Sequence, residues 1–134
     1  MVSLEERMKD LEERQKIANV LNSNSLYCLG VLHCGYNRIT INVKDNCSKQ
    51  FSYTSFNSKE DGRIINIREG IHDPDIFVDV DAWVLEEILD KEQEILNNPV
   101  KYALRYQKNF KMPLKQKAKI LAGIATGYFR RKRD

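Results

Sequence analysis

The sequence predicts a single α+β domain in which N-terminal, central and C-terminal helices cover a mainly antiparallel sheet of four or five strands. Three observations lead to this fold class. Apolar residues recur at helical spacing in residues 3–22 and 82–96, apolar and polar residues alternate in the segments between them, and polar turn residues separate those segments. A chain of 134 residues has room for one domain. We expect that domain to cover residues 1–129 and a basic tail to follow at residues 130–134.

The first helix is predicted to begin at the capping residue Ser3. Ser3 and Glu6 have the spacing of a capping box, in which the two side chains bind amide groups that the first turn leaves unpaired. Apolar residues then follow one side of the helix as far as the polar run at residues 22–25. Because Arg14 and Gln15 interrupt this apolar side, we favour packing against the sheet over a dimer seam between two chains.

Four strands are predicted in the middle of the chain, connected mostly by hairpins and therefore antiparallel, at residues 38–43, 50–56, 63–67 and 75–81. In the last of them Ile76, Val78 and Val80 face inward, and polar residues or Phe occupy the alternate positions. The apolar run at residues 26–32 is assigned to the same β region, and residues 108–112 are a candidate fifth strand.

Helices are predicted for most of the remaining chain. Asp81 is expected to cap a helix that begins at Ala82 and has a wide apolar face. Pro99 suits the first turn of the next helical segment, since its missing amide would be unpaired there anyway. A last helix is expected after Pro113, and we expect it to bury an apolar stripe that consists of Leu114, Ala118, Leu121, Ala125 and Tyr128.

Charge is sorted by position. Residues 1–100 hold 11 Lys and Arg against 18 Asp and Glu (net −7), whereas residues 101–134 hold 11 against one (net +10), in agreement with the overall charge of +3. A basic amphipathic segment indicates an anionic partner, which is a phospholipid surface, a nucleic acid or the acidic part of the chain itself. The cations expected to contact an anionic surface are Lys108, Lys111, Lys115, Lys117, Lys119, Arg130, Arg131, Lys132 and Arg133.

Two alternatives to a membrane partner stay open. Aromatic residues lie among the cations after residue 100, as in proteins that stack on nucleic acid, although Tyr102 and Tyr106 fall on a helical face beside the one with Lys101 and Arg105. The other alternative is an oligomer in which the basic third of one chain meets the acidic helix at residues 86–94 of another.

Metal sites and catalytic groups are not predicted. Cys28, Cys34, Cys47, His33 and His72 are residue types that bind zinc, but their spacing matches no usual zinc site, so we expect reduced thiols in the core. Three cysteines cannot all pair within one chain, and neither a secretory core nor a run of about 18 apolar residues is present, which favours a cytoplasmic location. Aspartates between residues 73 and 81 suit turns and caps, and no catalytic triad or phosphate loop accompanies them.

One stretch resembles a known family. The string Asp73-Pro-Asp-Ile-Phe-Val-Asp-Val-Asp81, the helix after it and the segment Asn98-Pro99-Val-Lys-Tyr-Ala-Leu104 are similar to the sterol carrier protein type 2 family of lipid-binding domains. The order of the helices and hairpins matches as well. Residues 106–113 lack the two glycines of the corresponding family strand, and lysines crowd the start of the last helix. We therefore interpret the chain as a divergent member.

The resemblance implies an apolar cavity for a fatty-acyl or isoprenoid chain, with no catalytic residue and no cofactor. The predicted function is a non-enzymatic lipid-binding or lipid-carrier domain whose basic C-terminal helix docks on anionic membrane; the alternative is a nucleic-acid-associated protein that uses its basic third. The residues expected to line the cavity are Ile39, Ile41, Phe51, Ile76, Val78, Trp83, Val84, Ile88, Leu104 and Phe110.

Overall fold

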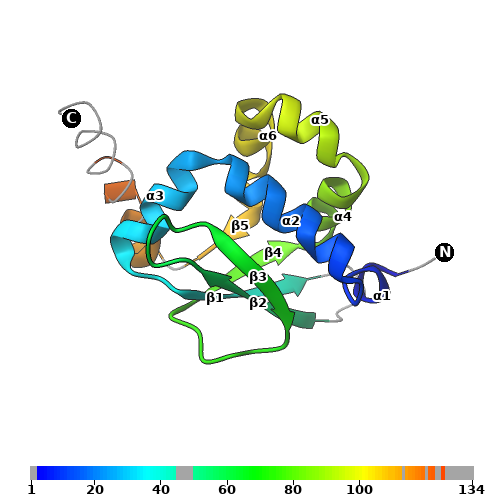
Figure 1. Ribbon diagram of the computed structural model, residues 1–134, viewed down its shortest axis with the longest axis horizontal. Helices are drawn as coiled ribbons and strands as arrows, with labels where there is room; N and C mark the ends of the chain where they lie inside the picture. The colour runs from blue at the N-terminus through cyan, green and yellow to red at the C-terminus, as the bar shows by residue number, and fades with distance from the viewer. Residues whose placement is uncertain (1–2, 45–49, 113, 120, 123–124, 126–134) are drawn as a thin grey trace.

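A five-stranded mixed sheet carries helices on one of its faces (Figure 1). The computed structural model describes residues 3–44, 50–112, 114–119, 121–122 and 125. In space the strands follow the order β3-β2-β1-β4-β5, and neighbouring strands are antiparallel except β1 and β4, which are parallel. The predicted α+β class with a mainly antiparallel sheet is thus confirmed. The strands are β1 (Arg38–Lys44), β2 (Gln50–Asn57), β3 (Ile64–Glu69), β4 (Ile76–Asp81) and β5 (Phe110–Lys111).

Helices precede β1 and follow β4 in the sequence. Figure 1 shows α2, α4, α5 and α6 on the same face of the sheet and α3 at one end of it. The helices are α1 (Leu4–Arg7), α2 (Leu11–Ser23), α3 (Ser25–Cys34), α4 (Ala82–Asp90), α5 (Glu92–Asn97) and α6 (Pro99–Tyr106), and a 3-10 turn, η1 (Gln107–Asn109), leads from α6 to β5.

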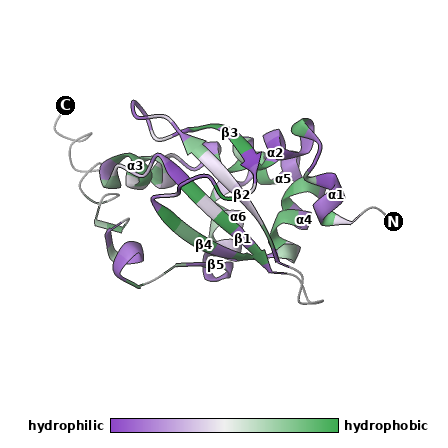
Figure 2. Cartoon of the chain, turned by 90° about the horizontal axis from the view of Figure 1, so that it is seen from below, coloured by the Kyte–Doolittle hydropathy of each residue, from purple (hydrophilic) through white to green (hydrophobic). Residues whose placement is uncertain are grey.

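The main core lies between the sheet and these helices. It includes Val80 of β4 together with Val84 and Ile88 of α4, each at most 1% exposed. Alternation also places Ile76 and Val78 of β4 inward, where they form a smaller cluster with Ile39 and with Val31 of α3. Figure 2 views the molecule from below, so that the face of the sheet away from the helices is toward the reader and the helices lie behind it.

The face of the sheet away from the helices is crossed by the connection from β3 to β4. Thr40 and Thr54 are fully buried there, and their hydroxyls lie 2.8 Å apart. The Thr54 hydroxyl donates to the carbonyl of Gly70 (2.8 Å) and accepts from the amide of His72 (3.2 Å), which ties the connection to the sheet. β4 therefore does not follow β3 through a hairpin, which corrects the predicted connection, and it pairs in parallel with β1.

The N-terminal helix is divided in two. The amide of Glu6 donates to Ser3 Oγ at 3.2 Å, which confirms the predicted cap, but the first helix ends at Arg7. Asp10 then begins α2 by accepting a hydrogen bond from the amide of Glu12 at 2.9 Å. This second N-cap starts a new helix although the spacing of apolar residues continues across the break.

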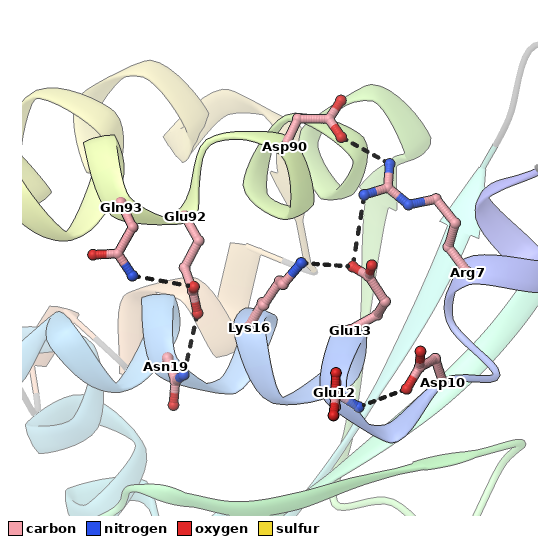
Figure 3. A network of polar contacts seen from close by, with 9 residues as sticks. All are labelled: Arg7, Asp10, Glu12, Glu13, Lys16, Asn19, Asp90, Glu92 and Gln93. Carbon is pink, nitrogen blue, oxygen red and sulfur yellow. Dashed lines mark hydrogen bonds and ion pairs between the residues drawn. The ribbon is translucent and has the colours of Figure 1, made fainter.

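A polar network ties both parts of this divided helix to α4 and α5 (Figure 3). Arg7 donates to Asp90 Oδ1 of α4 at 2.8 Å and pairs with Glu13 of α2 at 3.6 Å. Further along α2, Asn19 donates to Glu92 of α5 at 3.1 Å. These contacts fix the helical layer that lies above the sheet.

The apolar run at residues 26–32 is helical, which corrects its assignment to the β region. Asn24 caps α3 by accepting from the amide of Tyr27 at 3.1 Å, and Gly35 ends it in the left-handed conformation (φ 71°). An apolar run between a cap residue and a glycine is ambiguous by periodicity alone, because a helix that is apolar on several sides shows no stripe.

Two further predictions are corrected. Asp81 precedes α4 in an extended conformation, but its carboxylate accepts from Asn109 at 2.8 Å and caps no amide of the helix. Residues 114–119 and 121–122 are helical, yet Leu114 is 82% and Leu121 59% exposed, and Ala118 and Ala125 are exposed too. The apolar stripe of the last helix is therefore not buried, and its Tyr128 lies outside the described residues.

Candidate functional site: an apolar cavity under the helices

A cavity of about 210 Å³ lies between the helical layer and the sheet. Buried side chains form its floor, with Ile39 and Ile41 from β1, Val78 from β4, and Ile88 and Ile95 from α4 and α5. Each of these residues is at most 6% exposed. Alternation in the strands and the apolar face of α4 bring them together, because both patterns direct their apolar side chains into the same layer.

The mouth of the cavity is marked by lining residues that also reach solvent. On one side these are Ser23 and Tyr27, where α2 passes into α3. On the other side they are Pro99 and Ala103 of α6 and Gln107 of η1, and Met112 follows β5. The cavity therefore opens between the start of α3 and α6.

None of the described residues that line the cavity is charged. The lining is apolar apart from Ser23, Asn24, Gln107 and three tyrosines. Asn24 is already used as the cap of α3, and Ser23 Oγ donates to the carbonyl of Val20 at 2.5 Å. The interior is thus suited to hydrocarbon, because a charged group inside it would have no partner for its lost hydration.

The tyrosines keep their hydroxyl protons. Burial raises the pKa of Tyr106 to about 12, with a smaller contribution from the carboxylate of Glu87. Burial also raises the pKa of Tyr27. Tyr102 is held by its hydroxyl, which donates to Glu94 at 3.1 Å. All three are therefore neutral at physiological pH.

Half of the residues predicted to line the cavity lie on its wall. Ile76, Val84 and Phe51 instead pack in the surrounding core. The five on the wall are Ile39, Ile41, Val78, Ile88 and Phe110.

Two predicted residues lie away from the cavity. Trp83 is 40% and Leu104 62% exposed, and neither lines it. Trp83 occupies the outer side of α4, where the guanidinium of Arg105 lies 5.3 Å from its ring. One residue corresponds to 100° of rotation on a helix, so Trp83 points away while Val84 points in.

The contributions of α2 and α3 to the cavity were not predicted, and α6 contributes residues other than the predicted Leu104. Val20 and Leu21 come from α2, and Tyr27 from α3, which was not expected to be helical. Tyr102 and Tyr106 on α6 are four residues apart, and this spacing on a predicted helix was the signal that could have placed them on one buried face.

The predicted cations are exposed wherever the structure describes them. This holds for Lys108, Lys111, Lys115, Lys117 and Lys119, while residues 130–133 lie outside the described part of the chain. Tyr102 and Tyr106 are 6% and 4% exposed. Buried rings cannot stack on bases, so α6 does not provide the exposed aromatic side chains that a nucleic-acid surface would need.

The thiols and carboxylates form no second site in the described residues. Cys28 is buried and Cys34 half-buried, and burial raises the pKa of both thiols, whereas Cys47 lies outside the described part. No group of three or more His, Cys, Asp and Glu side chains that could hold a metal ion occurs within the described ranges. Asp75 binds the amides of Asn37 and Arg38 at 2.7 and 3.0 Å, which is a structural use.

Among the described helices, none has the length and apolarity needed to cross a membrane. No protein-family model matches the sequence, and no curated protein sequence matches it.

Several solved structures are similar to this chain, among them the following three. Sterol carrier protein 2 has a TM-score of 0.43 and 15% identity, covering 88% of this chain and 94% of that one. Sterol carrier protein 2 from Yarrowia lipolytica in its apo form has a TM-score of 0.39 and 16% identity, covering 84% and 86%. A conserved hypothetical protein from Thermus thermophilus, described as a candidate sterol carrier protein, has a TM-score of 0.42 and 15% identity, covering 88% and 85%.

These structures carry the family name that residues 73–104 suggested. Their TM-scores are below 0.5 and their identities near 15%, so the likeness carries no argument about function. The cavity of this chain has a mainly apolar lining without charged residues among the described ones.

Proposed function

We propose that this chain is a non-enzymatic lipid-binding domain that holds a fatty-acyl or isoprenoid chain in its cavity. The observation that carries the proposal is the 210 Å³ of space lined by buried aliphatic and aromatic side chains. No catalytic group accompanies this space within the described residues, and the proposed role therefore requires binding alone. A cytoplasmic location belongs to the same proposal.

The size of the cavity limits what it holds. Apolar cavities of about 150 Å³ take up benzene, whereas sites that enclose drug-sized ligands measure about 300–1,000 Å³. At 210 Å³ the cavity suits one segment of a chain, with the remainder in the mouth. Each buried methylene contributes about 0.8 kcal/mol, so affinity is expected to rise with chain length until the cavity is full.

The uncharged lining also sets the orientation of the ligand. A carboxylate or phosphate would lose its hydration inside the cavity without gaining an ion pair. The apolar end is therefore expected to enter first, and the polar head to stay at the mouth near the exposed Ser23 and Gln107.

Blocking the cavity tests this proposal. Ala103 lines the cavity on α6, and its neighbour Leu104 is 62% exposed outside it. We expect Ala103→Phe to lower the affinity for a fluorescent fatty acid about tenfold or more, because the ring displaces at least two methylenes. Leu104→Phe is the matched control and should bind like the wild type. Equal binding by Ala103→Phe, with its thermal unfolding unchanged, would overturn the proposal.

Docking on anionic membrane through the basic C-terminal helix is the finer part of the proposal. Lys115, Lys117 and Lys119 are exposed in residues 114–119, beside an exposed Leu114. Charge reversal of the three lysines is expected to abolish co-sedimentation with anionic vesicles, because each cation near such a surface contributes about 1 kcal/mol. Unchanged sedimentation would contradict a contact through this helix.

A further inference from the structure

We infer that the outer side of α6 is a membrane-contact surface that borders the mouth of the cavity, and that its partner is an anionic phospholipid bilayer. This α6 surface consists of Val100, Lys101, Leu104 and Lys108. The inference rests on the proposed function, since it assigns the place where a lipid would pass between bilayer and cavity. It names a surface distinct from the C-terminal helix.

Apolar side chains are exposed on the α6 surface without a partner in the described part of the chain. Val100 is 71% and Leu104 62% exposed, one helical turn apart. Both side chains therefore present aliphatic surface to solvent on the outer side of α6.

Helix geometry places the exposed pair directly beside the opening. With 100° per residue, the side of α6 that contacts the core holds Tyr102 and Tyr106, and the lining then continues through Ala103 to the exposed Gln107. Val100 and Leu104 follow next around the helix. Going around α6, the side that contacts the core is followed by the side that borders the cavity mouth, and then by the side that exposes Val100 and Leu104.

Cations lie beyond that pair. Lys101 follows Leu104 around α6, and Lys108 lies in the 3-10 turn after it; both are exposed. Neither forms an ion pair with a described carboxylate, whereas Arg105 on the same helix is paired with Glu87 at 3.1 Å. Two lysines without such ion pairs beside two exposed aliphatic residues form the pattern of a segment that lies at a membrane interface.

A bilayer fits this surface better than a second copy of the chain. A stable protein interface buries about 1,600 Å² in total, which a pair of exposed aliphatic residues on an eight-residue helix does not approach. A bilayer requires no complementary surface: a few aliphatic side chains enter it, and lysines bind the lipid phosphates.

Vesicle co-sedimentation tests the α6 surface with two double variants of the full chain. The probe is vesicles of phosphatidylcholine and phosphatidylserine, compared with vesicles of phosphatidylcholine alone. We expect Lys101→Glu/Lys108→Glu to lower partition about fivefold or more per lysine on the anionic vesicles. Val100→Ser/Leu104→Ser should lower partition on the same vesicles by about tenfold or more, since several methylenes leave the interface.

Matched controls exist for both variants. Leu11 (72% exposed) lies at the end of α2 away from the cavity and Ile65 (65% exposed) lies on β3, so Leu11→Ser/Ile65→Ser should sediment like the wild type. Lys9→Glu/Lys59→Glu removes the same charge from exposed positions elsewhere. If these controls lose as much partition as the α6 variants, the surface is not specific and the inference fails.

Fatty-acid binding without vesicles separates this inference from the proposed function. Val100→Ser/Leu104→Ser should retain wild-type binding, because neither residue lines the cavity. If the wild type binds the fatty acid but not the vesicles, or if the α6 variants sediment unchanged, the α6 surface is wrong while the cavity function stands. A drop from dimer to monomer in the Val100→Ser/Leu104→Ser variant would show a contact between copies and would also overturn it.

Discussion

At Gly62 both the backbone conformation and the lack of space exclude a side chain. It has φ +74°, and a Cβ there would overlap the carbonyl oxygen of Cys28 and lie 3.1 Å from Leu32 Cβ. The turn between β2 and β3 is thus pressed against the backbone of α3. Asn57 Nδ2 donates to the Gly62 carbonyl at 3.2 Å, which holds the turn in place from the sheet side.

Gly62→Ala is therefore expected to destabilise the protein by about 2–4 kcal/mol, from the left-handed conformation and from overpacking against α3. Gly35→Ala is the matched control: its φ is +71°, but a Cβ there meets nothing within 4 Å. It should lose only the conformational part, about 1–2 kcal/mol. Urea unfolding of both variants measures the difference, and equal losses would mean that the contact with α3 contributes nothing.

The alternation of inward and outward residues in strands predicted part of the cavity wall but not its helical side. Ile39, Ile41 and Val78 were placed on the wall because strand faces have a fixed period of two. Leu104 was misplaced because it lies on the outer side of α6, whereas Tyr102 and Tyr106, four residues apart, mark the buried side. Tyr27 could not be placed, since it depends on α3 being a helix.

At the scale of elements, short helices and their caps were the hardest part to predict. The break between α1 and α2 depends on Asp10 acting as a second N-cap, although the apolar spacing around it is continuous. Long alternating strands were predictable because successive apolar and polar positions define a face. The capping pair Asn24 and Gly35 defined α3, but an apolar run between them also fits a strand.

The α1 segment is held by charge as well as by packing. Arg7 bridges Asp90 and Glu13, and its side chain is 25% exposed while that of Asp90 is 60% exposed (Figure 3). Arg7→Met is expected to lower the free energy of unfolding by about 0.5–1 kcal/mol, as exposed ion pairs contribute little. Denaturant unfolding at low and high salt measures this, and the gap to the wild type should shrink at high salt.

Lys9→Met is the control for that variant, because Lys9 is exposed two residues away and forms no ion pair with the described residues. Its unfolding free energy should match that of the wild type at both salt concentrations. A loss at Arg7 that is independent of salt would show that the side chain acts through apolar contacts of its stem and not through the ion pairs.

At the scale of the whole molecule, the order of strands required information beyond the sequence. The connection from β3 to β4 crosses the open face of the sheet, which puts β4 beside β1 in parallel. The buried pair Thr40 and Thr54 holds that connection, but both residues read as ordinary strand threonines in the sequence. Pairing between distant strands depends on such tertiary contacts, and local patterns do not encode it.

Stability of the whole fold is expected to fall at alkaline pH because of buried tyrosines. Burial raises the pKa of Tyr53 to about 12, with smaller contributions from Glu69 and Glu5, and its hydroxyl has no hydrogen-bond partner in the described part of the chain. The pKa of Tyr106 is raised to about 12 as well. In the unfolded chain both pKa values return to about 10. Since the folded values are higher, the stabilisation is complete below pH about 10 and is lost as the pH rises toward 12.

Tyr53→Phe isolates this effect from other alkaline titrations. The variant lacks one of the tyrosines whose pKa is raised. Near neutral pH it should be at least as stable as the wild type, because it removes a buried hydroxyl without a partner among the described residues. Urea unfolding followed from pH about 8 to about 11 should show a shallower decline for the variant than for the wild type. If the two declines are parallel, the Tyr53 hydroxyl ionises in the folded chain as readily as in the unfolded one, and the layer between helices and sheet admits more water than its packing indicates.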